Sequence, residues 1–280
     1  MFARLFLFWL SLVGRARLHL TCGQYGTLSL TNQRVTWQRG GHDPRASLSE
    51  RSRLSGTRGL PVVDTYDVVV VGSGAGGLAA AITAKLAGMR PLLIEKTPLI
   101  GGSSVLSGGV LWMPNNPLLA REGIADSREA ALRYLENFVE EGDPASTPAR
   151  REAFVDAVGP LVTLMEEQGM QYLRCPKYSD YYDHLPGGHA LGRSLQADLY
   201  DANRLGSWKA KLRVPAVPIP VRTSEGAQLM RFGHAFDGKV MAAKVAGRIV
   251  KAKLTGRTMY GSGGALQGRM LEIALRLGVD

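Results

Sequence analysis

A glycine-rich turn that directly follows a hydrophobic strand constrains the fold of this chain more than any other feature. The run Asp67-Val-Val-Val-Val71 is β-branched without interruption, as a strand buried on both faces of a parallel sheet requires. It continues into Gly72-Ser-Gly-Ala-Gly-Gly77, which has GxGxxG spacing. Gly72 permits the sharp turn, Gly74 lets the backbone approach a pyrophosphate, and Gly77 lets the next helix pack on the strand.

The residues after the turn predict a helix and a second strand. The segment from Leu78 to about Leu86 is small and apolar, and its N-terminus would offer free N–H groups to a phosphate. A second apolar strand, Pro91-Leu-Leu-Ile94, ends in Glu95, 18 residues past Gly77. An acid at about this distance accepts hydrogen bonds from the adenosine ribose, and it would repel a 2′-phosphate. The order of elements therefore predicts dinucleotide binding.

The segment after Glu95 favours FAD over a nicotinamide dinucleotide. A nicotinamide-binding unit would usually continue into another helix and strand, whereas residues 96–109 form a loop rich in Gly and Ser. Such a loop can surround the rest of a longer ligand with backbone N–H and hydroxyl donors. Apolar residues recur through the loop, including Leu99, Ile100 and Val105, so a flexible surface loop is a poor explanation of it.

The run VVVVGSGAGGLAAAITAKLAGMRPLLIEKTPLIGGSSVLSGGVLWMP resembles flavoproteins of the fumarate reductase/succinate dehydrogenase type. Within that superfamily it is most similar to the N-terminal half of the 3-ketosteroid Δ1-dehydrogenases. The resemblance implies an α/β fold, with a Rossmann-like FAD-binding domain of the glutathione reductase type, incomplete at the C-terminus and carrying an added helical segment. It also implies FAD held without a covalent link, and the loop contains no histidine of the covalent type.

By this resemblance, successive segments of the chain hold the adenosine ribose, then the pyrophosphate and ribityl chain, then the flavin ring. The candidate cofactor-binding residues are Gly72, Ser73, Gly74, Ala75, Gly76, Gly77, Glu95, Lys96, Gly101, Gly102, Ser103, Ser104, Ser107, Gly108 and Gly109. No metal ligand is expected, because Cys22 and Cys175 lack ligand spacing and a site formed by His184 and His189 is disfavoured.

Two helices are expected after the cofactor unit. Asp126-Ser127 precedes a helical pattern over residues 128–141, and Thr147-Pro148 precedes another pattern that Gly159-Pro160 is expected to split. Their apolar residues recur at helical spacing and are attributed to core packing.

A tyrosine-rich stretch at residues 176–194 contains the candidate catalytic residue. A loop of this composition is more often a packing feature. The steroid dehydrogenases, however, carry Asp-Tyr-Tyr ahead of Gly-Arg-Ser at the matching place, here Asp180-Tyr181-Tyr182 and Gly192-Arg193-Ser194. In that family the first tyrosine is catalytic. The resemblance therefore implies Tyr181, with Tyr182 as the fallback.

The implied reaction explains the need for a phenol. Desaturation next to a ketone removes a proton from the α-carbon and a hydride from the β-carbon, and flavin N5 takes the hydride. A phenol with a pKa near ~10 is a poor base unless a positive charge or a hydrogen-bond donor lowers its pKa. His184, His189 and Arg193 are nearby in sequence, which leaves open the identity of any assisting group. The expected partners are a steroid-like ketone and an external electron acceptor.

Two other functions remain as alternatives. A fumarate reductase-like enzyme would act on small dicarboxylates, and a truncated protein could bind flavin without catalysis. Nucleic-acid binding is not expected. Although the net charge is +10, residues 1–64 contribute +6 of it, and no basic stripe interleaved with aromatic residues follows.

Residues 1–64 differ in character from the rest. They are expected to be a disordered leader, a targeting peptide, or an extension from a start codon placed too early, with a membrane anchor as a further alternative. A cytoplasmic location is expected, with a targeting peptide left open. Residues 65–280 are interpreted as the N-terminal portion of the FAD-binding domain, with a dinucleotide unit at 66–114 and a helical, Tyr-rich segment at 126–200.

A Pro-rich and basic segment at 203–260 and a final helix at 265–277 complete the chain. Within the first, residues 237–254 predict a basic helix whose lysines would face solvent or a membrane surface, so peripheral membrane association stays open. The resemblance places the substrate domain and further catalytic residues beyond residue 280. We therefore expect a fragment with little or no dehydrogenase activity.

Overall fold

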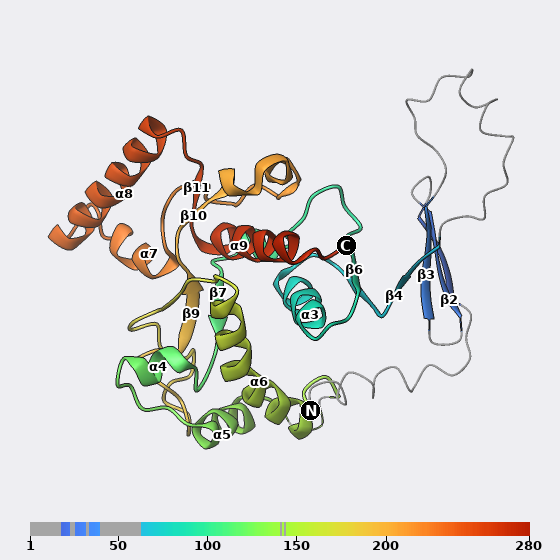
Figure 1. Cartoon of the computed structure of the whole chain (residues 1–280). Helices are drawn as coiled ribbons and strands as arrows, with labels where there is room; N and C mark the ends of the chain where they lie inside the picture. The colour runs from blue at the N-terminus through green and yellow to red at the C-terminus, as the bar shows by residue number, and fades with distance from the viewer. Residues whose placement is uncertain (1–17, 23–25, 32–33, 40–62, 141, 143) are drawn as a thin grey trace, which may run out of the picture. The chain divides into compact units, whose positions relative to one another are not determined.

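A computed structural model of the chain describes residues 18–22, 26–31, 34–39, 63–140, 142 and 144–280 (Figure 1). The chain divides into two compact units, which are described in turn. The first comprises residues up to Val71, residues 80–94 and residues 279–280, and the second comprises residues 72–79 and 95–278.

The first unit contains the parallel strand pair that the sequence predicts. Strand β5 (Val68–Val71) pairs in parallel with β6 (Pro91–Ile94), in the register Val68 opposite Pro91 through Val71 opposite Ile94. The backbone of Asp280 accepts a hydrogen bond from Leu93 N at 2.8 Å, which ties residues 279–280 to β6.

The connection between these strands is helix α3 (Ala75–Leu86), which begins three residues before the predicted start at Leu78. The helical hydrogen bonds already include Leu78 N to Gly74 O at 3.0 Å, so the glycines of the turn form the first helical turn. Gly88, with φ +82°, follows the end of the helix in the left-handed conformation that glycine adopts without strain.

Four antiparallel strands also belong to the first unit: β1 (Leu18–Cys22), β2 (Gly26–Thr31), β3 (Arg34–Arg39) and β4 (Val63–Tyr66), paired in that order. The expectation of a disordered leader is therefore wrong for the described residues between 18 and 39. Apolar and polar residues alternate in LHLTC, GTLSLT and RVTWQR, which is a strand pattern that the arginine content obscured. Residues 40–62 lie outside the described part, and the targeting alternatives stay predictions.

The second unit is built on a three-stranded antiparallel sheet in the order β7-β9-β8. Its strands are β7 (Val110–Trp112), β8 (Tyr172–Arg174) and β9 (Ser194–Ala197). The central strand β9 is buried along its whole length and follows Arg193 directly. The short helix η3 (Ser104–Leu106) precedes β7.

Three helices follow β7: α4 (Pro117–Arg121), α5 (Arg128–Phe138) and α6 (Pro148–Glu167). As the sequence predicts, Ser127 caps α5, and its side chain accepts a hydrogen bond from Ala130 N at 3.1 Å. The expected split at Gly159-Pro160 is wrong, because α6 runs through Pro160. An internal proline costs about 3 kcal/mol, and burial of Val155, Val158, Val162 and Met165 on the same helix offsets that cost.

The remaining elements are β10 (Tyr200–Asp201), η4 (Ala202–Lys211), α7 (Thr223–Leu229), α8 (Phe236–Leu254), β11 (Met259–Tyr260) and α9 (Ser262–Leu277). The basic helix and the final helix are thus confirmed, the latter beginning three residues before the predicted position 265. Helix α9 is buried from Gly263 to Leu271 without interruption. Within the described residues, no helix is both long enough and apolar enough to cross a lipid bilayer.

Candidate functional site

The glycine-rich turn, Glu95 and the loop that follows it meet at the N-terminus of α3, within the second unit, and together they form what we call the cofactor cradle (residues 72–77 and 95–109). Gly72 adopts φ +95° and Gly102 adopts φ +52°. A Cβ atom on Gly102 would lie 3.9 Å from the Cα atom of Gly74, whereas one on Gly72 or Gly76 would meet no protein atom within 4 Å. The backbone of the turn is therefore open to a ligand on one side and closed by the loop on another.

Ser73 connects the three parts of the cradle. Its side chain is fully buried, and its Oγ atom donates to Glu95 Oε2 at 2.7 Å and accepts from Gly101 N at 3.0 Å. The Ser73 amide donates to the same carboxylate oxygen at 3.0 Å. One serine thus fixes the position of the acid relative to both the turn and the loop.

The Glu95 carboxylate is ionised and held in place at the end of β6. Burial raises its pKa, but hydrogen bonds from Ser73 and Thr97 outweigh that effect and lower the pKa to about 2. Thr97 donates to Oε1 through its amide at 3.1 Å, and its hydroxyl lies 3.3 Å from the same oxygen but closer, at 2.8 Å, to Leu99 O. Because a hydroxyl has one proton to donate, the shorter bond to Leu99 O leaves a lone-pair position on Oε1 open to a ribose hydroxyl.

Ser104 lies at the mouth of α3, where the sequence predicted a cofactor contact. Its Oγ atom accepts from Ala75 N at 3.1 Å and thereby satisfies one of the free amides at the helix start. The amides of Gly74, Gly76 and Gly77 have no protein acceptor within the described residues. The side chains of the predicted contacts Lys96 and Ser103 are exposed.

The flavin-side part of the loop packs backbone to backbone on the start of α9. A Cβ atom on Gly109, which has φ +64°, would lie 2.5 Å from Gly263 N, and one on Gly263 would lie 2.2 Å from Ser104 O. Gly263 N donates to Ser107 O at 3.1 Å, and the Thr223 hydroxyl donates to Gly108 O. Gly263 was missing from the predicted site, although the Gly261-Ser-Gly-Gly264 run could have indicated it.

The cradle fits a flavin dinucleotide on the chemistry of its donors. Unpaired amides at the mouth of α3 suit a pyrophosphate, the oriented carboxylate suits a ribose, and the open space beside Gly72 and Gly76 leaves room for a ligand against the backbone. Each of these features comes from one compact unit of the structure.

The predicted tyrosines lie on the tyrosine loop (residues 176–193), at its surface. Tyr181 is 85% exposed and Tyr182 is 45% exposed. Tyr182 contacts Phe138 with ring centroids 5.1 Å apart and contacts the ring of His184 edge-on. Burial, followed by the effect of the neighbouring Tyr181, raises the pKa of Tyr178. The role of Tyr181 stays a prediction.

A buried ion network lies directly beneath these tyrosines. The side chain of Asp180 accepts from Arg193 Nη2 at 2.6 Å, from Trp112 Nε1 at 2.8 Å and from His189 N at 3.1 Å. Arg193 is fully buried and also donates to Asp126 Oδ1 at 3.1 Å. No hydrogen bond among the described residues joins the Arg193 guanidinium to Tyr181 or Tyr182, so its contacts are those of an anchor for the loop.

The guanidinium of Arg193 also lies over two aromatic rings. Its Cζ atom is 5.1 Å from the centroid of Trp112 and 5.3 Å from that of Tyr134. The hydroxyl of Tyr134 in turn accepts from Tyr182 N at 3.3 Å. Trp112 thus links β7, next to the cradle loop, to the segment that carries the tyrosines.

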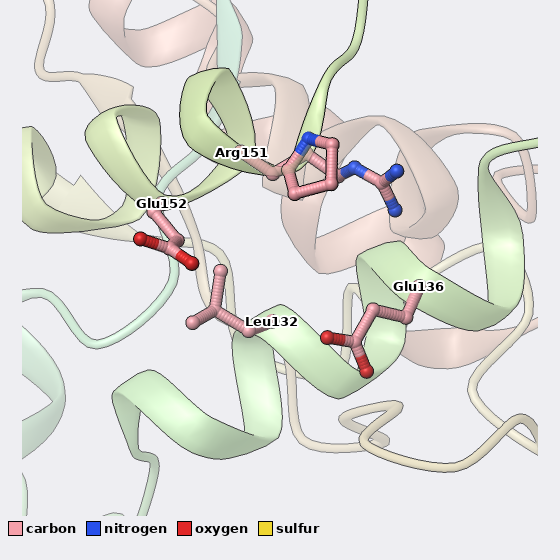
Figure 2. A pocket seen from close by; sticks show the side chains of 5 residues that line it. Leu132, Glu136, Arg151 and Glu152 are labelled. Carbon is pink, nitrogen blue, oxygen red and sulfur yellow. The ribbon is translucent and has the colours of Figure 1, made fainter. Parts of the chain in front are cut away.

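A hollow of about 320 Å³ lies elsewhere, between α5 and α6 (Figure 2). It is lined by Leu132 and Glu136 of α5 and by Pro148, Arg151 and Glu152 of α6. None of the cradle or tyrosine-loop residues lines it, so we assign it no part in cofactor binding.

The described residues contain no group of three or more His, Cys, Asp and Glu side chains that could hold a metal ion. Cys175 is buried, and burial raises the pKa of its thiol to about 11.

Comparison with known proteins agrees with this geometry. Residues 67–261 match the FAD binding domain family. The 3-oxosteroid 1-dehydrogenase of Mycobacterium tuberculosis is 37% identical over 223 residues, covering 78% of this chain and 39% of the relative. The 4-oxocyclohexanecarboxylate 2-dehydrogenase of Sinomonas cyclohexanicum is 33% identical over 242 residues, covering 76% and 41%.

A solved structure is similar over the same region. The crystal structure of 3-ketosteroid Δ1-dehydrogenase from Sterolibacterium denitrificans, in complex with 1,4-androstadiene-3,17-dione, has a TM-score of 0.67 and 31% identity. The match covers 76% of this chain and 39% of that one, so the chain spans about two fifths of the length of these relatives. The resemblance found from the sequence motifs is thereby confirmed, and the chain belongs to the FAD binding domain family, with FAD as its cofactor.

Proposed function

We propose that this chain is the FAD-binding part of a flavoenzyme that desaturates a carbon–carbon bond next to a ketone in a steroid-like substrate. The observation that carries the proposal is the hydrogen-bonded junction of Ser73, Glu95 and Gly101 in a chain similar to 3-oxosteroid 1-dehydrogenases. The relatives' names supply the substrate class, and the cradle supplies the place for the cofactor.

The proposed reaction divides the work between the cofactor and the protein. FAD, when bound, supplies the acceptor for a hydride from the β-carbon. The phenol oxygen of Tyr181 would take the proton from the α-carbon, and the electron pair of that C–H bond would form the new double bond. The exposure of Tyr181 leaves its hydroxyl accessible to a substrate, while the buried carboxylate of Asp180 holds the adjacent backbone. An external electron acceptor would then reoxidise the flavin.

The cofactor half of the proposal is tested by adding FAD to the purified chain. We expect a bound flavin spectrum, and a preparation that stays colourless after incubation with FAD would contradict the assignment. Anaerobic addition of a 3-ketosteroid, and separately of fumarate to the reduced protein, then distinguishes the candidate substrates. Bleaching by the ketosteroid supports the proposal, and reoxidation by fumarate supports the dicarboxylate alternative. Neither reaction in the flavin-loaded chain is the result expected of an FAD-binding part alone, and catalysis is then tested in a longer protein.

The catalytic half needs a protein in which the rest of the relative is present. We suggest a chimera in which residues 67–261 of this chain replace the matching segment of the Mycobacterium tuberculosis relative. Changing Tyr181→Phe should lower kcat by about 10²–10⁴-fold without loss of flavin. The matched Tyr182→Phe change should have little effect. The opposite outcome would transfer the role to Tyr182, and wild-type kcat in both variants would rule out both tyrosines as the base.

A further inference from the structure

One arginine beside the cofactor cradle has no partner among the described residues. Arg213 follows the end of η4, its side chain is half-buried, and its Nε atom is inaccessible to solvent without a hydrogen-bond acceptor. Every other arginine within residues 63–140 and 144–280 makes a hydrogen bond or an ion pair, apart from Arg133, which is exposed. Because a buried donor without an acceptor is costly, the Arg213 side chain calls for an acceptor that these residues do not supply.

The backbone of Arg213 is joined to the cradle loop. Its amide donates to Ile100 O at 2.9 Å, and Ile100 N donates to Lys211 O at 2.7 Å, so the two segments pair like neighbouring parallel strands. Leu212, which lies between the two bonded residues, is buried, and its Cδ1 atom would be 3.6 Å from a Cβ atom on Gly101. Arg213 is therefore fixed against the residue that directly precedes Gly101.

The next two residues of the cradle loop reach the glycine-rich turn. Gly101 N donates to Ser73 Oγ at 3.0 Å, and a Cβ atom on Gly102 would lie 3.9 Å from Gly74 Cα. The Gly74 amide is one of those at the mouth of α3 that have no acceptor within the described residues. The residue that bonds to Arg213 is thus two positions along the loop from the place where the loop meets these amides.

The cradle has no net charge with which to balance a diphosphate. Its residues include one acid, Glu95, and one cation, Lys96. The Glu95 carboxylate is ionised and is bound by donors of Ser73 and Thr97 rather than by a cation. The Lys96 side chain is exposed. A pyrophosphate is a dianion, so a cation close to the cradle and without a protein partner would complement its charge.

We propose that the Arg213 guanidinium binds the pyrophosphate of FAD, together with the amides at the mouth of α3. A guanidinium presents a planar fork of donors that fits phosphate oxygens in pairs. The pyrophosphate is favoured over the flavin ring because the flavin-side part of the loop, residues 107–109, begins six positions beyond Gly101. The inference rests on FAD as the cofactor and is independent of the proposed reaction.

The test is calorimetric titration of the purified chain with FAD and, separately, with ADP, which carries the diphosphate without the flavin. Arg213→Gln should weaken both ligands by about ten- to a hundredfold, as loss of a hydrogen bond to a charged group would give. Arg213→Lys keeps the charge without the fork and should retain more affinity than Arg213→Gln. The control Lys211→Gln removes a positive charge from an exposed side chain of the same segment and should leave both affinities within twofold.

Two further measurements separate this role from a structural one and from a contact with the flavin. Urea unfolding of the cofactor-free chain should have the same midpoint in Arg213→Gln as in wild type, because the Nε atom has no acceptor among the described residues. The flavin reduction potential should also be unchanged in the variant. Affinities for FAD and ADP that stay within twofold of wild type would overturn the proposal. So would an unchanged ADP affinity with a lowered flavin potential, since that result would place the guanidinium at the flavin ring.

Discussion

The cofactor cradle and the tyrosine loop belong to the same unit, but different groups position them. In the cradle, backbone amides and glycines make the contacts, and Gly109 and Gly263 approach each other too closely for any side chain. In the tyrosine loop, buried side chains make the contacts, and Asp180 and Arg193 hold a segment whose tyrosines face outward. An added side-chain atom should therefore destabilise the cradle, whereas the loss of one charged partner should destabilise the tyrosine loop.

The ion network has a charge balance that explains its sensitivity. Two buried carboxylates, of Asp180 and Asp126, share one guanidinium, of Arg193. Trp112 and the backbone of His189 also donate to Asp180, and the backbone amides of Asn115 and Ser127 also donate to Asp126. Every member therefore depends on the others, since a buried charge without its partners is costly.

The largest effect should follow removal of one carboxylate from this network. Asp180→Ala leaves Arg193 buried with one ionic partner and should lower the free energy of unfolding by about 3–5 kcal/mol. Urea-induced unfolding measures the change. The control Asp156→Ala removes the carboxylate of an exposed pair with Arg128 and should leave the unfolding midpoint close to that of wild type. Equal effects of the two substitutions would show that the network does not anchor the loop.

The next largest effect should follow addition of one methyl group to the cradle. Gly109→Ala would place a Cβ atom 2.5 Å from Gly263 N in a left-handed residue, and we expect a loss of about 3 kcal/mol together with loss of FAD binding. Gly123 has a similar φ of +68° but meets no atom within 4 Å. Gly123→Ala should therefore cost only about 1 kcal/mol and leave flavin affinity unchanged. Flavin fluorescence and urea unfolding measure both effects for the two variants. Equal losses of stability and flavin affinity in Gly109→Ala and Gly123→Ala would mean that the close contact with Gly263 does not cause them.

A smaller effect should follow loss of the serine that joins the parts of the cradle. Ser73→Ala removes the hydroxyl between Glu95 and Gly101 and leaves a buried amide unpaired, which should cost about 1–3 kcal/mol. FAD affinity should fall about tenfold, as 1.4 kcal/mol of lost preorganisation would give. The exposed neighbour Ser103, whose side chain caps no amide, supplies the control Ser103→Ala. Unchanged FAD titrations for Ser73→Ala would show that Glu95 needs no support.

The same contrast explains how much the sequence could predict. The turn, the acid and the loop of the cradle follow from residue types at fixed spacings, because the positive φ at Gly72 favours glycine and hydrogen bonding to a ribose favours an acid at Glu95. The contact of Gly109 with Gly263 joins segments more than 150 residues apart, and no local pattern encodes such a pairing. The strands between residues 18 and 39 were missed because arginine-rich composition outweighed their alternating pattern.

The tyrosine loop was predictable only as a motif. The motif contains Asp180 and Arg193, and it leaves open whether Arg193 assists the base. Its burial and its bonds to Asp180 and Asp126 depend on how β7, α5 and β9 pack, which spacing alone does not reveal. Similarly, α6 continues through Pro160 because its buried face outweighs a local preference.

The smallest effect expected at neutral pH concerns the charge of Glu95, and it appears only in acid. Its pKa is about 2 in the folded protein, below the ordinary value of 4.5, so the folded state favours the ionised form. The stability that this preference contributes is complete above about pH 4.5 and is lost as the pH falls toward 2. Glu225, held by Arg248 and Arg222, also has a pKa of about 2 and titrates in the same window. Glu95→Gln should therefore remove only part of the acid sensitivity in urea unfolding between pH 5 and 2, and Glu225→Gln should remove another part. A Glu95→Gln protein with the full wild-type pH dependence would mean that the cradle, unlike the ion network, does not depend on charge.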